Sequence, residues 1–427
     1  MHYNLTLRRG RESYSNLTDM NLNLKLILSI SLFSTILISN SNSQTTQKFD
    51  DTLVFIESER KIENSISFNT AYTNYEKIQA ITGEKISVTA TMLIINRDTL
   101  VPEAISTRGQ SSLSFRRKSF TFDLKSNASF RHGDRTESFK KFVVLSLSMD
   151  KNYGSNRLAF EMMGSCHLFN LFYSFCELRI NGQTEGIYMV IERPEDWAMK
   201  MKKSPLLIRR GYNHAIDKIK TGIETTSDEA KKYKDNFRQI YSSLNKYEGE
   251  ELYKVLSNLL DIEVYMKWIA FNFFVKNGDY TDEVFFYVDK DINKYNIIPW
   301  DYDDLFSAAP HEGNVLNRKL RAGKLFFSTE DLLDRKIVSD PYLYKQYLIQ
   351  LRELLNQLSP DVIKRAFENT YAELYPYYSD NEIISKSEYD LYTGDSLPKL
   401  KYELSTLCEK LLIYRDVYIK DIDSKIK

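Results

Sequence analysis

Three carboxylates stand close together in the stretch NIIPWDYDDLF, which covers residues 296–306. Asp301, Asp303 and Asp304 directly follow an apolar run that is typical of a buried strand. Carboxylates repel one another, so such a cluster indicates a bound cation, a basic partner or an exposed acidic loop. In an extended chain Asp301 and Asp303 would point to one side and Asp304 to the other, because side chains alternate.

A further acidic position, Asp279, is predicted to lie beside this cluster. The segment EVFFYVDKDINKYNIIPW, residues 283–300, reads as a strand, a polar turn at about 289–294 and a returning strand. Strands of a hairpin lie about 5 Å apart, so the residues just outside its two ends become neighbours. Asp279 and Asp301 therefore predict one acidic site that suits a hard cation such as Mg²⁺. An acidic surface loop is the alternative.

A lysine is predicted on the core-facing side of an earlier strand, in RGQSSLSFRRKSFTFDL at residues 108–124. Strand alternation places Lys118 on the same face as Phe120 and Phe122. A lysine in that position needs a carboxylate or a phosphate as its partner. The turn RGQSS ahead of it offers backbone N–H groups and hydroxyls that could cover phosphates as a short lid. The alternative is a connecting loop with Lys118 reaching out to water.

The helical segment NRLAFEMM, residues 156–163, supplies a candidate partner for that lysine. Glu161 follows Arg157 by four residues, which is the spacing of an ordinary surface pair. If Leu158 and Met162 pack on the sheet, Glu161 could instead reach Lys118.

The elements around these residues predict an α+β fold. Strand signals dominate from residue 52 to about 193 and include a hairpin at Asn181-Gly182. Helical patterns dominate from about 261, beginning with an apolar helix that has Asp261 as N-cap and Gly278 as stop. We therefore predict a β-rich lobe over residues 50–200 and a mostly helical lobe over 201–427 that contains the acidic hairpin.

The bulk composition restricts the classes of partner. The chain has 427 residues, of which 42% are hydrophobic, so it can form a substantial core. Lys plus Arg equals Asp plus Glu at 58 each, which removes the bulk electrostatic argument for nucleic acid or an anionic membrane. The three cysteines Cys166, Cys176 and Cys408 have no metal-ligand spacing and are too few for a disulfide scaffold. A bridge between Cys166 and Cys176 stays open.

The N-terminal segment is typical of a secretory signal peptide. MNLNLKLILSISLFSTILISNSNSQ, starting at Met20, has Lys25, an apolar stretch over residues 26–38 and a polar run of small residues. The apolar stretch is too short to span a bilayer comfortably. We predict a signal peptide over residues 1–44 with Met20 as the true start, and export to the periplasm, the cell surface or the medium. An uncleaved membrane anchor is the alternative.

The order of these features resembles the CotH kinase family, atypical kinases of the secretory pathway related to spore-coat protein H. The matching segments run from about Arg108 to Phe306 and are RGQSS…RRKSFTFDL, NRLAFEM, LRINGQTEGIYMVIER and NIIPWDYDDLF. The resemblance implies a protein-kinase-like fold of two lobes. It also implies transfer of the γ-phosphate of ATP to a Ser or Thr hydroxyl of a protein, assisted by Mg²⁺ or Mn²⁺.

The resemblance also implies a role for each matching residue. Lys118 would hold the ATP phosphates and pair with Glu161, under a lid of Arg108, Gly109 and Ser111. Glu192 would lie near the nucleotide. Asp279 would orient or deprotonate the acceptor hydroxyl, Asp301 would bind the metal ion, and Asp303 would support it.

Two positions depart from the family pattern. Ser155 stands where an Arg usually precedes Asn156, and Arg157 is the possible substitute. Asp282-Glu283 stands where an Asn ligand is usual, so Glu283 becomes a candidate metal ligand that adds negative charge opposite the phosphates. A non-catalytic module that holds a partner protein or a cell-surface glycan therefore stays open beside the kinase. A third reading is a glycosyltransferase, since many of these hold their cation with Asp-x-Asp; the β-rich first lobe argues against it.

Overall fold

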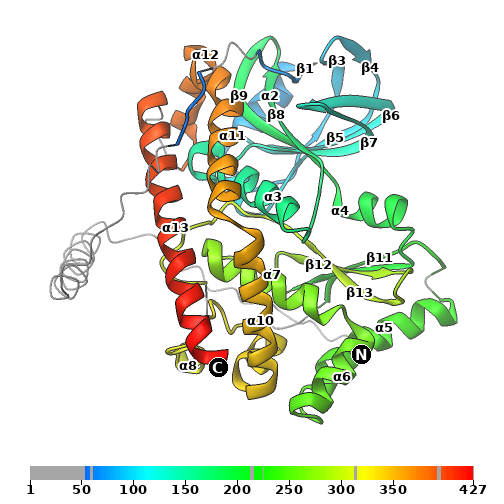
Figure 1. The fold of residues 1–427 in the computed structure, drawn as a ribbon. Coiled ribbons are helices and arrows are strands. Elements are labelled where there is room, and N and C mark those ends of the chain that lie inside the picture. Colours follow the sequence, from blue (N-terminus) through cyan, green and yellow to red (C-terminus); the bar gives the residue numbers. More distant parts are fainter. Residues whose placement is uncertain are drawn as a thin grey trace, which may run out of the picture. The chain divides into compact units, whose positions relative to one another are not determined.

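The computed structural model describes residues 53–57, 61–211, 216–224, 226–311, 315–391 and 396–426 (Figure 1). The chain divides into two units, Met1–Asp51 and Thr52–Lys427, and everything below concerns the second. The predicted signal peptide lies outside the described residues. No helix in these described ranges combines the length and the hydrophobicity that a bilayer span requires.

A nine-stranded sheet occupies the first half of the described chain, with strand order β2-β5-β6-β7-β9-β8-β1-β3-β4. Neighbouring strands are antiparallel except β1 and β8, which are parallel. The strands are β1 (Ser65–Thr70), β2 (Ser87–Val88), β3 (Ala90–Ile95), β4 (Asp98–Leu100), β5 (Pro102–Arg108), β6 (Ser119–His132), β7 (Arg135–Leu145), β8 (Tyr173–Ile180) and β9 (Gln183–Glu192).

The predicted alternation in β6 is confirmed. Phe120, Phe122 and Leu124 are fully buried in one hydrophobic cluster, where Phe122 stacks on Phe142 of β7. The hairpin between β8 and β9 is also confirmed, because Asn181 and Gly182 both have positive φ, as a type I′ turn requires. These local patterns set the register of the sheet.

A second, four-stranded sheet has the order β11-β10-β12-β13. The predicted acidic hairpin forms its edge, as β12 (Val284–Asp289) pairs antiparallel with β13 (Lys294–Pro299). The other two strands, β10 (Leu206–Arg210) and β11 (Ile216–Thr221), were not predicted from the sequence. They are short and lack a tight hairpin signal between them, so neither stood out from the sequence.

Helices make up most of the remaining described chain. They are α2 (Tyr72–Gln79), α3 (Ser155–Ser165), α4 (Pro194–Asp196), α5 (Asp228–Ser243), α6 (Gly249–Leu259), α7 (Ile262–Val275), α8 (Val315–Leu320), α9 (Leu332–Ser339), α10 (Pro341–Gln357), α11 (Pro360–Tyr378), α12 (Asn381–Ile384) and α13 (Leu397–Ile426). Short 3₁₀ turns are η1 (Ser111–Ser114), η2 (Lys151–Tyr153) and η5 (Ser385–Tyr389). In Figure 1, α11 and α13 run side by side along the molecule.

Helix α7 is the buried helix that the sequence predicts. The Asp261 side chain accepts a hydrogen bond from the Val264 N–H, as expected of an N-cap. The prediction that Gly278 ends the helix is wrong, because α7 ends at Val275 and Lys276 adopts the left-handed conformation. Gly278 instead lies against Asp304, to whose carbonyl its N–H donates.

The end of the chain returns to the first sheet. Arg117, just before β6, is buried between the rings of Tyr153 and Tyr188 and forms an ion pair with Asp390. Helix α12 and the 3₁₀ turn η5 contact β9. Cys166, Cys176 and Cys408 are all buried and free, so the open Cys166–Cys176 bridge is not formed. The architecture is the α+β class that the sequence predicts.

Candidate active site

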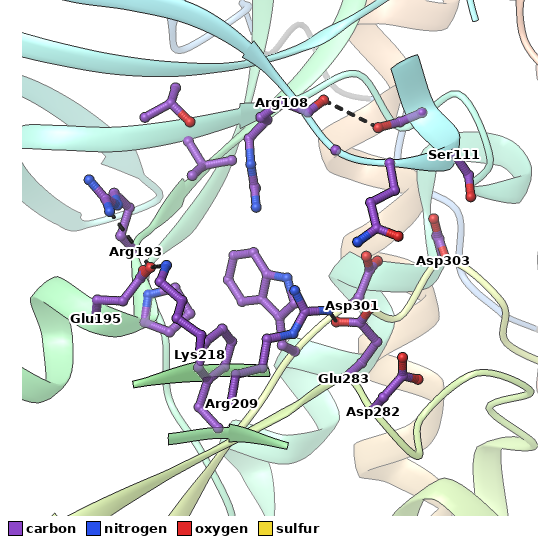
Figure 2. A pocket seen from close by; sticks show the side chains of 18 of the residues that line it. Arg108, Ser111, Arg193, Glu195, Arg209, Lys218, Asp282, Glu283, Asp301 and Asp303 are labelled. Atoms are coloured by element: carbon purple, nitrogen blue, oxygen red, sulfur yellow. Dashed lines mark hydrogen bonds and ion pairs between the residues drawn. The ribbon is translucent and has the colours of Figure 1, made fainter. Parts of the chain in front are cut away.

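A cavity of about 680 Å³ lies where the two sheets face each other. The first sheet contributes Arg108 at the end of β5, together with the turn over residues 109–112. The connector after β9 contributes Arg193, Pro194 and Glu195. The second sheet and its loops supply the opposite wall, so the cavity is built from segments that are distant in the sequence (Figure 2).

One side of the cavity carries five carboxylates, from Asp279, Asp282, Glu283, Asp301 and Asp303. Antiparallel pairing of Val284 with Pro299 brings the two ends of the hairpin together, so these acids come from both sides of it. Figure 2 shows the carboxylates of Glu283, Asp301 and Asp303 along one side of the cavity.

Asp301 and Asp303 both line the cavity, which is the grouping that alternation predicts. The backbone reason differs from the expected extended exit, since Asp301 has a φ of 54° and therefore turns the chain in the left-handed conformation. Asp304 is not among the cavity-lining residues and contacts Ser307 and His311 instead. Its Oδ1 accepts a hydrogen bond from Ser307 Oγ at 2.7 Å, and its Oδ2 lies 3.2 Å from His311 Nε2.

Backbone hydrogen bonds fasten the two acidic loops to each other. Phe306 N–H donates to the Val275 carbonyl and Ser307 N–H to the Lys276 carbonyl, each at 3.0 Å. Gly278 N–H donates to the Asp304 carbonyl and His311 N–H to the Gly278 carbonyl, each at 2.9 Å. The position of Asp279 relative to Asp301 is thus fixed by the main chain.

Burial and repulsion between neighbouring carboxylates disfavour the ionised forms of the acids on this side of the cavity. Burial raises the pKa of Asp303 well above its ordinary value, and the charges of Asp301 and other nearby carboxylates raise it further. The pKa of Glu283 is raised well above its ordinary value for the same two reasons. Burial also raises the pKa of Asp301, and the positive charge of Arg108 opposes that effect. Such a cluster favours a cation.

Arginine side chains partly compensate this charge from both sheets. Arg209 of β10 binds Glu283 with its Nη2, which lies 2.8 Å from Oε1 and 2.9 Å from Oε2. Arg108 of β5 reaches into the cavity, with its guanidinium 5.6 Å from the centre of the Trp300 ring (Figure 2). Each sheet thus supplies one cation to the acidic side.

The connector side of the cavity has the opposite charge balance. Lys218 of β11 forms an ion pair with Glu195, and Arg193 Nη2 lies 3.6 Å from Glu195 Oε1. Burial alone would raise the pKa of Glu195, yet the Lys218 hydrogen bond and the Arg193 charge hold it down at about 2. Arg193, Glu195 and Lys218 were not predicted as site residues. The one sequence feature that could have indicated Arg193 is its position directly after the strand GIYMVIE. Lys218 belongs to no motif.

Lys118 is not among the residues that line the cavity. It is buried, and its Nζ donates to the carbonyls of Phe115 and, at 2.6 Å, Leu113 at the end of η1. Lys118 directly precedes β6, which begins at Ser119, so the alternation of the strand does not fix its direction. Within the strand, Phe120 packs in the hydrophobic cluster, whereas Thr121 on the other face lines the cavity. Lys118 therefore fixes the turn that carries the predicted lid.

The expected ion pair between Lys118 and Glu161 is wrong. Glu161 binds Arg157 of its own helix and accepts a hydrogen bond from Asn369 Nδ2 at 2.7 Å. Arg157 also binds Glu373, with Nη2 2.6 Å from Oε1, so it does not substitute for the arginine that Ser155 replaces. Helix α3 packs against α11, which carries both Asn369 and Glu373.

Of the remaining predicted site residues, two line the cavity and one does not. Gly109 and Ser111 line the cavity, and Gly109 has a φ of 107° that favours glycine. A Cβ there would lie 1.8 Å from Ser112 Oγ. Glu192 is not among the lining residues, because the cavity meets the connector only from Arg193 onward.

Asn156 links helix α3 to the acidic loop. Its Oδ1 accepts a hydrogen bond from the Tyr302 N–H at 2.9 Å, between the two cavity aspartates. Asp150 in turn accepts from the backbone N–H groups of Ser155 and Asn156, at 2.8 and 3.0 Å. Ser155 thus belongs to the support of the site through its backbone N–H.

Comparison with known proteins identifies the family. The sequence model described as CotH kinase protein matches residues 105–394, which include both sides of the cavity. The chain belongs to the CotH kinase family. This membership supports a kinase-like function in general and agrees with the α+β fold of a β-rich part followed by a mostly helical part.

The other comparisons add little to the family match. Among curated proteins nothing matches the chain. Among solved structures, a chain of the Shewanella oneidensis MR-1 toxin–antitoxin complex of HipA, HipB and operator DNA is similar. The identity is 11% and the TM-score 0.31, and the alignment covers 71% of this chain and 66% of that chain, just under two thirds of its length.

No group of three or more His, Cys, Asp or Glu side chains within the described ranges is arranged to hold a metal ion by itself. The five cavity carboxylates therefore supply oxygen donors, but no complete protein cage. Any ion bound here needs ligands from elsewhere, such as water or phosphate.

A first prediction concerns Gly278, which permits the close contact between the acidic loops. A Cβ at this position would lie 1.9 Å from Asp304 Oδ2 and 2.8 Å from Ser307 Oγ, so Gly278→Ala must displace the Asp304 side chain. We expect the free energy of unfolding to fall by about 1–3 kcal/mol, the usual effect of overpacking, in urea denaturation.

The control is Gly164→Ala near the end of α3, where a Cβ meets only ordinary contact distance, 3.9 Å from the Phe169 carbonyl. This variant should be neutral or gain up to about 1 kcal/mol, because alanine favours helix. Adding Asp304→Ala to Gly278→Ala removes the clashing carboxylate and should recover stability relative to the sum of the single changes. If Gly278→Ala and Gly164→Ala were equally stable, the close contact between Gly278 and Asp304 would not matter for folding, and the prediction would be contradicted.

Proposed function

We propose that this protein is a phosphotransferase that uses ATP and a divalent cation, Mg²⁺ or Mn²⁺, to phosphorylate a Ser or Thr hydroxyl of a protein. The observation that carries the proposal is the single cavity in which arginines from both sheets meet five carboxylates, within the region that matches the CotH kinase family. Catalysis of phosphoryl transfer consists mostly of positioning and charge neutralisation, and this arrangement suits both.

The chemistry of the donor set fits the cation. Asp301 and Asp303 present carboxylate oxygens, the ligands that Mg²⁺ and Mn²⁺ prefer. Mg²⁺ commonly takes one or two carboxylates and completes its shell with water and substrate phosphates, so an incomplete protein cage is what a nucleotide-bound ion needs. When bound, the ion would neutralise the phosphate charge. Glu283 is held by Arg209 and is better suited to an outer role than to direct ligation.

Arg108 is the candidate for phosphate binding in place of Lys118. It projects into the cavity beside the turn that contains Gly109 and Ser111, and its charge acts on Asp301. Guanidinium groups bind phosphate through two parallel hydrogen bonds, which gives both strength and orientation. The connector residues Arg193 and Glu195, with Lys218, would then lie toward the nucleoside end of ATP.

Asp279 is suited to the acceptor side. Its side chain lines the cavity yet remains 56% exposed, so an incoming hydroxyl can reach it. A carboxylate at that place can orient the hydroxyl and take its proton, the role of the catalytic aspartate in kinases.

Export and a protein or cell-surface partner belong to the proposal as well. Both rest on the N-terminal signal-peptide pattern and on the family, whose members act in the secretory pathway. A non-catalytic member that holds such a partner is the competing reading, and it gains support from Lys118, which contacts the lid turn and not the cavity. Nucleotide binding separates the two.

A second prediction concerns nucleotide binding and turnover. At a concentration one hundred times its Kd, Mg-ATP should raise the free energy of unfolding by about 2.7 kcal/mol. Asp301→Ala should remove the part of this stabilisation that depends on the metal ion. Asp279→Ala should keep the stabilisation and abolish phosphate transfer, because it removes the acceptor-side carboxylate only. Transfer from radiolabelled ATP and thermal unfolding measure the two effects.

Equal phosphorylation by the wild type and both variants would refute the assignment. No stabilisation by any nucleotide would favour the non-catalytic module.

A third prediction separates Arg108 from other arginines near the lid. Arg108→Met should weaken Mg-ATP binding roughly 10–150-fold, which corresponds to the 1.5–3 kcal/mol typical of a charged hydrogen bond. Arg116→Met is the matched control, because Arg116 is exposed and its guanidinium lies 4.9 Å from the centre of the Tyr389 ring, away from the cavity lining. Isothermal titration should find that Arg116→Met binds Mg-ATP with the affinity of the wild type. Equal losses in both variants would count against a phosphate contact at Arg108.

A further inference from the structure

We propose that His311 is a positioning residue that holds the Asp279 carboxylate in the orientation needed to receive the acceptor hydroxyl. The inference rests on the proposed function, because it assigns a second residue to the acceptor side of the same site. No sequence motif contains His311, and the sequence analysis gave it no role.

His311 lies between two carboxylates. Its Nδ1 is 3.7 Å from Asp279 Oδ1, and its Nε2 is 3.2 Å from Asp304 Oδ2. The two nitrogens of an imidazole are distinct binding groups, and a partner on one fixes the direction of the other. The ring thus lies within ion-pair distance of both carboxylates, with Nε2 beside Asp304 and Nδ1 beside Asp279.

Two hydrogen bonds hold the residues around His311. Ser307 Oγ donates to Asp304 Oδ1 at 2.7 Å, and the His311 N–H donates to the Gly278 carbonyl at 2.9 Å. The same glycine leaves room for the Asp304 carboxylate, which a Cβ would meet at 1.9 Å. Both the backbone and the side chain of His311 are thus tied to the loop that carries Asp279.

The arrangement has the logic of an orienting carboxylate, an imidazole and a reactive group. A residue that reaches the reacting group through a second side chain limits its rotamers, and misplacement by about 1 Å can cost about 100-fold in rate. The distance of 3.7 Å is longer than a hydrogen bond, and catalytic contacts often tighten only when substrate binds. The charge of Asp282 also repels Asp279, and His311 supplies an opposing attraction.

The contribution of His311 to folding should be small. Its side chain is 59% exposed and that of Asp279 is 56% exposed. Exposed ion pairs typically contribute up to about 1 kcal/mol. A large loss of turnover on substitution would therefore report on the site and not on unfolding.

The test compares three substitutions at this position in the full chain, with transfer of phosphate from radiolabelled Mg-ATP as the readout. His311→Ala should lower kcat at least about tenfold and leave the KM for Mg-ATP within about twofold of the wild type. His311→Asn places an amide nitrogen near the position of Nδ1 and should recover part of kcat. His311→Gln places its amide near Nε2, faces Asp304, and should recover less. His132→Ala, whose Nε2 lies 3.1 Å from Glu373 Oε1 and which does not line the cavity, is the matched control and should keep the wild-type kcat.

Wild-type turnover together with an unchanged kcat in His311→Ala would overturn this inference and leave the proposed function intact. Equal recovery by Asn and Gln would also overturn it, since orientation toward Asp279 would then not matter. A wild type that binds nucleotide and transfers no phosphate would overturn the proposed function, and the role of His311 with it.

Discussion

Repulsion among partly buried carboxylates is the constraint on which the rest of the site depends. Partial burial raises the pKa of Asp301, Asp303 and Glu283, and nearby charges raise it further, since Asp301 acts on the other two and Asp279 acts on Asp301. The fold keeps them together by covalent and main-chain means: the β12–β13 hairpin joins their loops, and backbone hydrogen bonds fasten residues 304–311 to residues 275–278. Two arginines, one from each sheet, offset part of the charge. The remainder is available to a cation.

This charge balance includes the two positions that are expected to depart from the family pattern. Glu283 stands where the resemblance implies an asparagine, and Arg209 from β10 binds both of its oxygens. Ser155 stands where the resemblance implies an arginine, and its backbone N–H, with that of Asn156, donates to Asp150. Arg157 binds Glu373 and does not substitute for that arginine. Cationic charge in the cavity comes instead from Arg108, Arg193, Arg209 and Lys218.

How much could be predicted from the sequence depends on the range of the interaction. The β12–β13 hairpin, the turn at Asn181-Gly182 and the face of β6 follow from local periodicity, and each is present. Periodicity says which residues share a face, but not what that face meets. Phe120 and Phe122 lie on the predicted side of β6, the cavity lies on the side of Thr121, and Lys118, just before the strand, donates to the carbonyls of Leu113 and Phe115. Glu161 binds Arg157, the pair that the local spacing offered, and also Asn369 on α11, which is 208 positions away and which no local pattern contains. His311 and Lys218 reach the site through loop and strand pairing alone.

The stability of the metal-free protein with Asn at position 303 is the measurement that tests the central claim most directly. The side chain of Asn has nearly the same shape as that of Asp and carries no charge, so Asp303→Asn removes repulsion from the cluster. In the presence of a chelator at pH 7, we expect the free energy of unfolding to rise, because burial and the neighbouring carboxylates disfavour the ionised form of Asp303 in the folded protein. On addition of Mg²⁺ and ATP the wild type should gain more stability than the variant. A variant that is less stable than the wild type without metal would contradict the account, because the carboxylates would then not be held together against their repulsion.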